Sequence, residues 1–532
     1  MADAVAAAPR RSPALLVVAG IAVGAVFALP LVSIVVNVAR NGPDGASVAL
    51  GSAWRPLAAS LALAVAVTVS TAAIGTALAF LTIRTDVPGR RLWRVLCPLP
   101  LVIPSYVGAS ALLAALAPGG LAASALEGLG ARALPDPSGF FGAYLVLTLL
   151  SYPYVYLPVA ARLSMLNPSL EESARLLGRS PAAVVRSVVL PQIGSSIAAG
   201  ALLVALYTVS DFGAVQLMRF DTLTRRIYET RLIDRPTSLV LSLLLTMVAL
   251  VVVVGERRAS RGLVASQVAR HKGALRWRLG RWRWPAAMLL VVVVGNAVIG
   301  PVSVLGFWAF RAVTNDAGIA VFDSGLGTLA PPLINTVLFG LAAAVVTMVL
   351  VFPVGFLQAR FASRSGAFVG VLVVTGFAVP GLVVALALTG LVLDTPGLVG
   401  LYQTFPLLLL AYSLHFGAQA LRSTTVAVSG VPPRLTEAAR LLGAGPLRRL
   451  LTVELPVMRP TLLAGAGLVM LSTMKELPAS LLLAPTGTET LATRIWAASE
   501  GMYLGEVGVT SIVLLSISGL LTWLLIVRPA PA

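Results

Sequence analysis

The hydrophobic positions of this 532-residue chain gather in long uninterrupted runs separated by short polar segments. About twelve runs reach roughly 20 residues, the length with which a helix crosses a hydrocarbon core of about 30 Å. They are too uniformly apolar for the alternating strands of a membrane barrel, and in lipid a helix pairs its own backbone groups. The pattern predicts an all-α polytopic membrane protein with spans at 14–37, 57–83, 95–117, 140–160, 193–218, 237–254, 286–310, 332–359, 367–393, 402–421, 460–484 and 508–527.

Composition excludes a water-soluble globule, because 58% of the residues are hydrophobic and only 11% are charged. The net charge of +18 could indicate nucleic-acid binding, but the basic residues concentrate in every second loop. That distribution is typical of cytoplasmic loops in a membrane protein. We therefore expect both termini in the cytoplasm and no nucleic-acid partner, and the single cysteine, Cys97, excludes an internal disulfide.

The chain contains an internal duplication. The segment ESARLLG at 172–178 reappears 265 residues later as EAARLLG at 437–443, and the Leu-Pro pairs at 190–191 and 455–456 keep the same offset. We expect two homologous six-helix halves. The predicted regions are 1–55 (N-terminal tail and first helix), 56–255 (first transmembrane domain), 256–331 (basic cytoplasmic linker and seventh helix) and 332–527 (second transmembrane domain).

Each repeated loop lies between the fourth and fifth span of its half, on the expected cytoplasmic side. It predicts two short helices separated by Gly178 in the first copy and by Gly443 in the second. The leucine pairs 176–177 and 441–442 give a charged helix an apolar edge suited to docking in a partner's groove. Helices lying idle on the membrane surface are the alternative. The repetition favours docking on a two-fold partner.

The repeated pattern, Glu-Ala-Ala followed by glycine and Leu-Pro, resembles the cytoplasmic loop of binding-protein-dependent ABC importer permeases. Two copies in one chain resemble the fused double-domain permeases for ferric iron, thiamine or phosphonates. The resemblance implies the type I permease fold, two copies of an ABC ATPase and an extracytoplasmic substrate-binding protein. It also implies that each loop is a coupling helix inserted into the ATPase, with contacts at Glu172, Ala174, Gly178, Glu437, Ala438, Ala439 and Gly443.

A second stretch narrows the cargo. Residues 474–483 and 490–496, and in the first half 210–213 and 222–228, look like the corresponding regions of iron(III) permeases. The resemblance implies iron(III) as cargo, in the inner membrane of a bacterial cell. Thiamine, a phosphonate or a polyamine remain alternatives within the same architecture.

Ionisable residues inside predicted spans are candidates for the translocation path, because charge in a bilayer is costly. The set comprises Tyr207, Ser210, Asp211, Lys475 and Glu476, of which the oxygen-bearing side chains suit a hard cation such as ferric iron. A structural ion pair or brace is the favoured alternative. Pro104 and Pro380 occupy matching spans, where they predict kinks that either move or pack statically.

The chain carries no phosphate-binding loop, and its two lysines, Lys272 and Lys475, lie outside any glycine-rich segment. We expect a non-catalytic subunit with no cofactor and no resident metal, and we interpret His415 as a packing residue. The basic linker at 255–284 carries three tryptophans, which indicates an anionic lipid surface as its neighbour. An ion-coupled secondary transporter is the competing class, but it gives no reason for paired loops.

Overall fold

The computed structural model describes residues 13–40, 42–130, 136–264, 276–314, 326–361 and 364–524. Within these ranges the regular elements are helices, and the extended pairing consists of one bridge between Thr85 and Trp277. Ten of the helices are long and apolar enough to cross a membrane. The predicted all-α membrane fold is confirmed.

The two remaining predicted spans are also helical, each with a complication. The ninth is a bent pair, Ser365–Gly376 and Gly381–Asp394, whose axes differ by 101°. The tenth corresponds to α19 (Phe405–Ser429), which has 25 residues but carries His415, Gln419 and Arg422 in its sequence. Polar residues of this kind lower mean hydropathy, so length alone marks α19 as a span.

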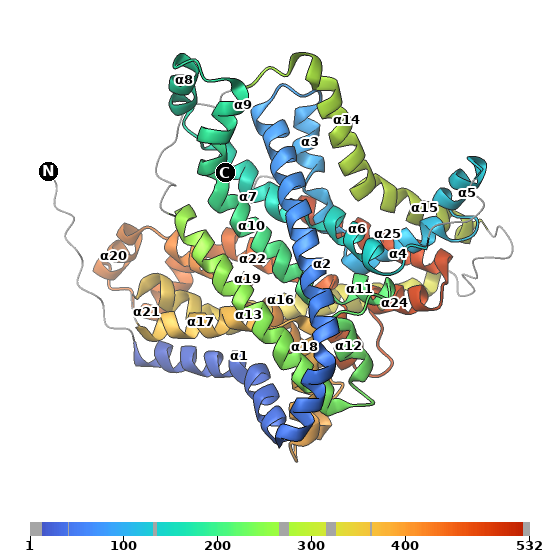
Figure 1. Cartoon of the computed structure of the whole chain (residues 1–532). Helices are drawn as coiled ribbons and strands as arrows, with labels where there is room; N and C mark the ends of the chain where they lie inside the picture. Colours follow the sequence, from blue (N-terminus) through green and yellow to red (C-terminus); the bar gives the residue numbers. More distant parts are fainter. Residues whose placement is uncertain are drawn as a thin grey trace. The chain divides into compact units, whose positions relative to one another are not determined.

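The helices form two compact units (Figure 1). Unit 2 comprises Pro43–Asp323 and Ile495–Leu515. Its helices are α2 (Gly42–Arg84), α3 (Arg90–Leu96), η1 (Leu99–Val102), α4 (Ser105–Leu116), α5 (Leu121–Gly128), α6 (Phe140–Ser151), α7 (Pro153–Ser164), α8 (Pro168–Leu176), α9 (Pro181–Val184), η2 (Val185–Val189), α10 (Leu190–Ser210), α11 (Gly213–Leu217), α12 (Leu223–Thr230), α13 (Arg235–Val264), η3 (Gly280–Trp282), α14 (Arg283–Val294), η4 (Gly295–Ile299) and α15 (Gly300–Val313).

Unit 1 comprises Met1–Gly42, Ser324–Arg494 and Ser516–Ala532. The unit boundary falls within α24 (Leu491–Glu500) and again within α25 (Leu504–Thr522). The other helices of unit 1 are α1 (Ala14–Arg40), η5 (Leu326–Leu329), α16 (Ala330–Arg360), α17 (Arg364–Ala378), α18 (Gly381–Asp394), η6 (Val399–Leu401), α19, α20 (Pro433–Leu441), α21 (Pro446–Arg449), η7 (Leu450–Glu454), α22 (Leu455–Met474) and α23 (Pro478–Leu483).

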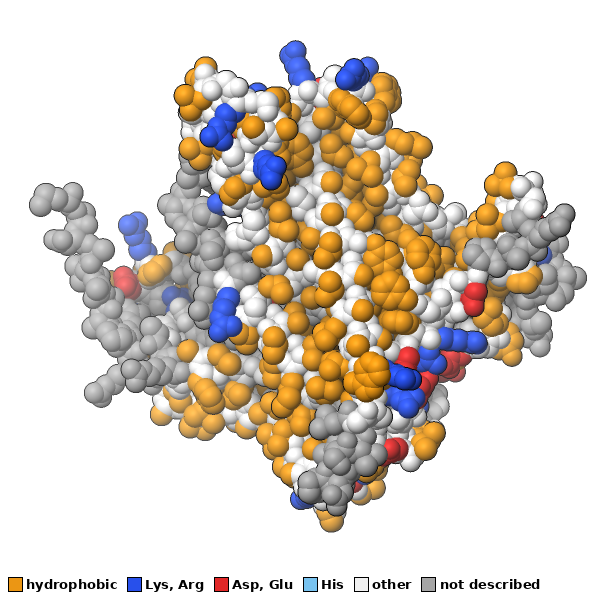
Figure 2. Space-filling view, in the orientation of Figure 1, with side chains coloured by type: hydrophobic (Ala, Val, Ile, Leu, Met, Phe, Trp, Pro, Cys, Tyr) orange, Lys and Arg blue, Asp and Glu red, His pale blue; other side chains and the backbone are white. Residues whose placement is uncertain are grey.

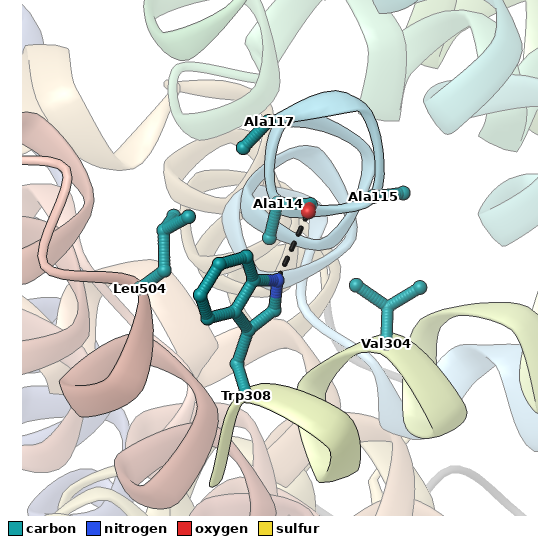
Figure 3. Packing of buried hydrophobic residues seen from close by; sticks show 6 residues of the cluster. All are labelled: Ala114, Ala115, Ala117, Val304, Trp308 and Leu504. Carbon is teal, nitrogen blue, oxygen red and sulfur yellow. Dashed lines mark hydrogen bonds between the residues drawn. The ribbon is translucent and has the colours of Figure 1, made fainter. Parts of the chain in front are cut away.

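In unit 2 the helix after the linker packs on helices from the first half of the chain. α15 contacts α4, and Trp308 of α15 is fully buried there. Its indole N–H donates to the carbonyl oxygen of Ala114 at 3.0 Å, and Val304 and Leu504 pack around the ring (Figure 3). A buried tryptophan with its N–H paired anchors α15 without an unsatisfied polar group.

In unit 1 the first helix of the chain packs on helices from the second half. α1 contacts α16, α17 and α18, and the Ser33 hydroxyl donates to the carbonyl oxygen of Ala387 at 3.1 Å. Small residues on α1 allow this close packing, since a Cβ at Gly24 would lie 3.1 Å from a Leu372 methyl group. The first span therefore shares its hydrophobic core with the second half of the sequence.

The duplication is also visible in the packing of each fifth span on its neighbour. A Cβ at Gly200 of α10 would lie 2.7 Å from the carbonyl oxygen of Tyr154 in α7. Gly465 of α22, 265 residues later, has the same role, because a Cβ there would lie 2.4 Å from Cβ of Ser423 in α19. Both positions need glycine for the same close approach.

Candidate coupling loops and helix breaks

The first coupling loop, residues 167–180, begins with a well-capped helix. The Asn167 side chain accepts a hydrogen bond from the Ser169 amide at 3.1 Å, and Pro168 occupies the first helical position of α8. The helix ends at Gly178, whose φ of +76° is the left-handed conformation that favours glycine. Leu176 and Leu177 are 89% and 82% exposed. The loop therefore presents an apolar edge outward, as the sequence predicts.

The second coupling loop, residues 432–445, repeats this shape in unit 1. α20 begins at Pro433 and is followed by Gly443 with a φ of +79°. Leu441 and Leu442 are 89% and 88% exposed. Its N-terminus differs, because Pro432 replaces the asparagine cap and supplies no side-chain hydrogen bond.

The residues predicted as ATPase contacts divide between two faces of each helix. Glu172, Gly178, Glu437, Ala438 and Gly443 lie on the exposed side. Ala174 and Ala439 are only 8% and 7% exposed and face the body of their own unit. Their small side chains let each helix lie close to the protein, so their contribution in the structure is to seat the helix.

The base of the first coupling loop contains charged residues that the sequence analysis missed. Glu171 and Arg84 are fully buried and form an ion pair, and the Arg84 guanidinium also donates to the Leu163 carbonyl oxygen. The Trp277 indole donates to the second Glu171 oxygen at 3.3 Å. Arg175 lies 4.1 Å above the Trp277 ring. These residues are 87 to 106 positions apart in sequence, so no local pattern signals the cluster.

Trp277 belongs to the linker, and its position corrects the expectation that the linker tryptophans all face lipid. Its amide donates to the Arg84 carbonyl oxygen at 2.7 Å, and its ring packs with Ala174 and Val184. Trp282 and Trp284 are instead 61% and 62% exposed. The linker residue His271 lies outside the described residues.

The base of the second coupling loop has a different chemistry. Position 436, the duplicate of Glu171, is threonine, and position 360, the duplicate of Arg84, remains arginine. The Arg360 guanidinium donates to the Thr436 hydroxyl at a long 3.5 Å. A charged pair in the first copy is thus replaced by one weak hydrogen bond in the second.

The candidate path carboxylate of the first half, Asp211, lies at a helix break. The sequence placed it inside a continuous span, but α10 ends at Ser210 and the short α11 begins at Gly213. One Asp211 oxygen accepts hydrogen bonds from the amides of Ala214 at 2.9 Å and Val215 at 3.4 Å. The carboxylate, which is 7% exposed, thereby caps the helix that restarts after the break.

Glu476 performs the same task in unit 1. α22 ends at Met474, and Glu476 accepts hydrogen bonds from the Ala479 amide at 3.0 Å and the Ser480 amide at 3.2 Å, which open α23. The Ser480 hydroxyl donates to the Glu476 carbonyl oxygen at 2.8 Å and pairs with the Tyr412 hydroxyl at 2.7 Å. The brace interpretation and the path interpretation therefore concern the same carboxylate.

Each break packs against another break, at the proline of the third or ninth span. α4 begins directly after Pro104 and α18 directly after Pro380, so these prolines interrupt their helices. α4 contacts α11, and α18 contacts α23. A Cβ at Gly381 would lie 3.0 Å from a Glu476 oxygen and 3.4 Å from the His415 ring. His415 thus lies beside the second carboxylate.

The remaining candidate residues surround these breaks. Tyr207 and Ser210 are half-buried on the last turn of α10, with the Tyr207 ring 5.6 Å from that of Tyr154, and Lys475 precedes Glu476. The first set belongs to unit 2 and the second to unit 1. Within the described ranges no three His, Cys, Asp or Glu side chains form a group that could hold a metal ion.

Aromatic contacts connect the first break to two short helices outside the spans. Phe212, next to Asp211, lies 4.7 Å from the Tyr228 ring on α12 and 5.2 Å from the Trp496 ring on α24. The Thr224 hydroxyl of α12 also donates to the Asp211 carbonyl oxygen at 2.7 Å. Displacement of α12 or α24 would therefore act directly on the break.

A comparison with known families decides what these duplicated features belong to. The model of the binding-protein-dependent transport system inner membrane component family matches residues 72–255 and again residues 352–528. The chain belongs to this family. As a member, the permease is a multi-pass membrane subunit of an ABC importer, and its family implies an ATPase and a binding protein as partners. The predicted family and the predicted double domain are confirmed.

Relatives of the permease differ in cargo. It is 27% identical to the Fe(3+)-transport system permease protein FbpB 2 of Haemophilus influenzae over 97% of this chain and 99% of that protein. It is 32% identical to the molybdenum transport system permease protein ModB of Mycobacterium tuberculosis, over 44% of this chain and 89% of that protein. The sulfate transport system permease protein CysT of Salmonella typhimurium is 28% identical over 26% of this chain and half of that protein.

Proposed function

We propose that the permease moves iron(III) from an extracytoplasmic binding protein into the cytoplasm of a bacterial cell, driven by two copies of an ATPase docked on its two coupling loops. The similarity over nearly the full chain to an Fe(3+)-transport permease supports the cargo, because the molybdenum and sulfate relatives match only part of it. The permease sits in the inner membrane with both termini in the cytoplasm, as the basic loops favour.

The exposed leucine pairs support the docking step. Each pair follows an exposed glutamate on a short helix and precedes a glycine that turns the chain away. The leucines would fill an apolar cleft of the ATPase, while Glu172, Glu437 and Ala438 contact its rim. ATP binding draws the two docked ATPase subunits together and moves the coupling loops with them. Hydrolysis then returns the permease to its resting state.

The helix breaks supply the movable part of the path. Asp211 and Glu476 hold the restarted helices α11 and α23 by accepting their first amides. Tyr207, Ser210 and Lys475 line the same turns and contact the cargo in transit. The binding protein would engage the segments 221–235 and 485–506, and the aromatic contacts of Phe212 carry that engagement to the first break.

Uptake into proteoliposomes tests this function. The full permease, its candidate ATPase and its candidate binding protein are reconstituted, and ATP-dependent uptake of radiolabelled ferric iron is measured beside molybdate, sulfate, thiamine, a phosphonate and a polyamine. Iron uptake that disappears without the ATPase is the expected result. Uptake of another cargo alone would overturn iron(III) and keep the importer. Uptake without the ATPase would overturn the ATP-driven mechanism in favour of an ion-coupled transporter.

Paired substitutions separate bracing from cargo binding at the breaks. Asp211→Asn keeps an oxygen that can accept the Ala214 amide but removes the charge, whereas Asp211→Ala removes both. If the carboxylate acts as a brace, uptake survives in the first variant and falls in the second. Loss in both variants would assign the negative charge to the path. Glu476→Gln and Glu476→Ala repeat the test in the second half.

A further inference from the structure

A basic pocket lies at the turn between α2 and α3, away from the helix breaks. Its wall consists of Asp86, Val87, Gly89, Arg90, Arg91, Leu92 and the linker residue Arg276, and it encloses a volume of about 570 Å³. Figure 1 places α3 at the same end of unit 2 as α8 and the start of α14. Figure 2 shows Lys and Arg side chains at this end, whereas hydrophobic side chains cover the middle of the unit.

Hydrogen bonds from a distant segment hold the pocket in shape. The Asp86 amide donates to the Trp277 carbonyl oxygen at 3.3 Å, and the Leu279 amide donates to the Asp86 carboxylate at 2.8 Å. The linker strand that carries Arg276 is therefore fixed against the end of α2. The one acidic side chain of the pocket already accepts a backbone amide.

The three arginines of the pocket leave positive charge without a matching anion in the wall. The Arg90 Nη1 atom is enclosed, yet it has no hydrogen-bond partner among the described residues. Burial, together with the positive charges of Arg276, Arg94 and Arg91, lowers the pKa of Arg90. An enclosed guanidinium N–H without an acceptor costs free energy, so the pocket is built to receive an anionic oxygen from outside the chain.

The surroundings of the pocket are apolar rather than polar. Leu92 and Val95 on α3 are 57% and 58% exposed, beside Arg91. Farther along the linker, Trp282 and Trp284 are exposed and carry Arg281 and Arg283 over their rings at 5.9 and 5.4 Å. Charge in the pocket with exposed hydrocarbon at its edge fits an amphiphile, whereas a free anion would use the charge alone.

We propose that the pocket formed by Arg90, Arg91 and Arg276 binds the phosphate of an anionic phospholipid headgroup, with the acyl chains lying along the exposed face of α3. Because Arg276 is adjacent to Trp277, the bound lipid holds the linker strand against the base of the first coupling loop. The site lies outside the cargo path and does not depend on which cargo the permease carries.

Lipid binding to the purified full-length permease tests the site. Native mass spectrometry in detergent measures the affinity for phosphatidylglycerol, with phosphatidylcholine and inorganic phosphate as comparison ligands. The pocket variant is Arg90→Gln, Arg91→Gln and Arg276→Gln together. The control variant is Arg278→Gln, Arg281→Gln and Arg283→Gln, which removes the same charge from the linker outside the pocket.

We expect phosphatidylglycerol affinity to fall about fivefold for each pocket arginine removed, and by less than about twofold in the control variant. Equal losses in both variants would reduce the pocket to general surface charge and overturn the proposal. Displacement of the lipid by millimolar inorganic phosphate would assign the pocket to a free anion instead. Arg90→Lys, which keeps the charge and loses the planar fork, covers the case in which the triple variant does not fold.

Discussion

The two coupling loops share an outer surface but differ in how they are supported. Both present a leucine pair more than 80% exposed and end at a glycine with φ near +80°. Beneath the first loop lies the buried ion pair of Arg84 and Glu171, with Trp277 of the linker against it. Beneath the second lies the 3.5 Å hydrogen bond from Arg360 to Thr436.

The difference shows which parts of a duplicated element are free to diverge. Any partner that docks on both copies reads the exposed edge, so that edge keeps its spacing of leucines and glycine. The base is read only by its own unit, and it has acquired a charged pair in one copy and a hydroxyl in the other. We therefore expect the first loop to be the more rigid of the two.

The largest expected effect is at the base of the first loop. Glu171→Ala leaves Arg84 buried without its carboxylate, which costs about 3–5 kcal/mol of local stability. Thr436→Ala removes one weak hydrogen bond and costs about 1 kcal/mol or less. Hydrogen exchange measured over α8 and α20 compares the two variants. Equal loss of protection would contradict the asymmetry, and the double variant Arg84→Met with Glu171→Met should restore protection of α8.

The outer surface should respond equally in both copies. Leu176→Asp with Leu177→Asp, and Leu441→Asp with Leu442→Asp, should each weaken binding of the ATPase by about tenfold or more, because apolar anchors dominate interface energetics. Titration of the permease with purified ATPase measures this. Leu232→Asp with Ile233→Asp is the matched control, since these residues are 84% and 91% exposed but lie on a loop predicted to face outward. An effect of the control pair would argue against specific docking.

A smaller and symmetric effect is expected at the two glycines. Alanine at Gly178 or Gly443 must adopt a positive φ, which costs about 1–2 kcal/mol, and no atom lies within 4 Å to add a clash. We expect both variants to lose part of their ATP-coupled uptake while the amount of protein in the membrane stays unchanged. Gly194→Ala on α10 is the control, because it has open space and helical dihedrals. Wild-type uptake in both loop variants would refute their coupling role.

The smallest expected effect concerns the caps. Asn167→Ala removes the side-chain acceptor at the start of α8 and costs about 1 kcal/mol. Pro432→Asn supplies the missing acceptor to α20, whose cap residue already has extended dihedrals. Protection of α8 should decrease and that of α20 should increase in hydrogen exchange. A change in the same direction for both would show that capping does not distinguish the loops.

Hydropathy predicted the helices well because it depends only on the length of each apolar run. It missed the interruptions at Asp211 and Glu476, since a few polar residues within an apolar run do not end it. It also missed the pair of Arg84 with Glu171, because a buried charge looks like any other charge until its partner is known. The repeated loop was found because its spacing of 265 residues is written in the sequence itself.

The packing of α1 has a consequence for synthesis of the chain. Phe27 of α1 lies against Gly417, and Ser33 bonds to Ala387, so the first helix to enter the membrane waits for partners more than 350 residues later. At 5–20 residues per second, the delay is roughly 15 to 75 s. During that time α1 exposes its glycine face to lipid and to neighbouring proteins. A ribosome that stops in the linker leaves a fragment whose first helix has no place to pack.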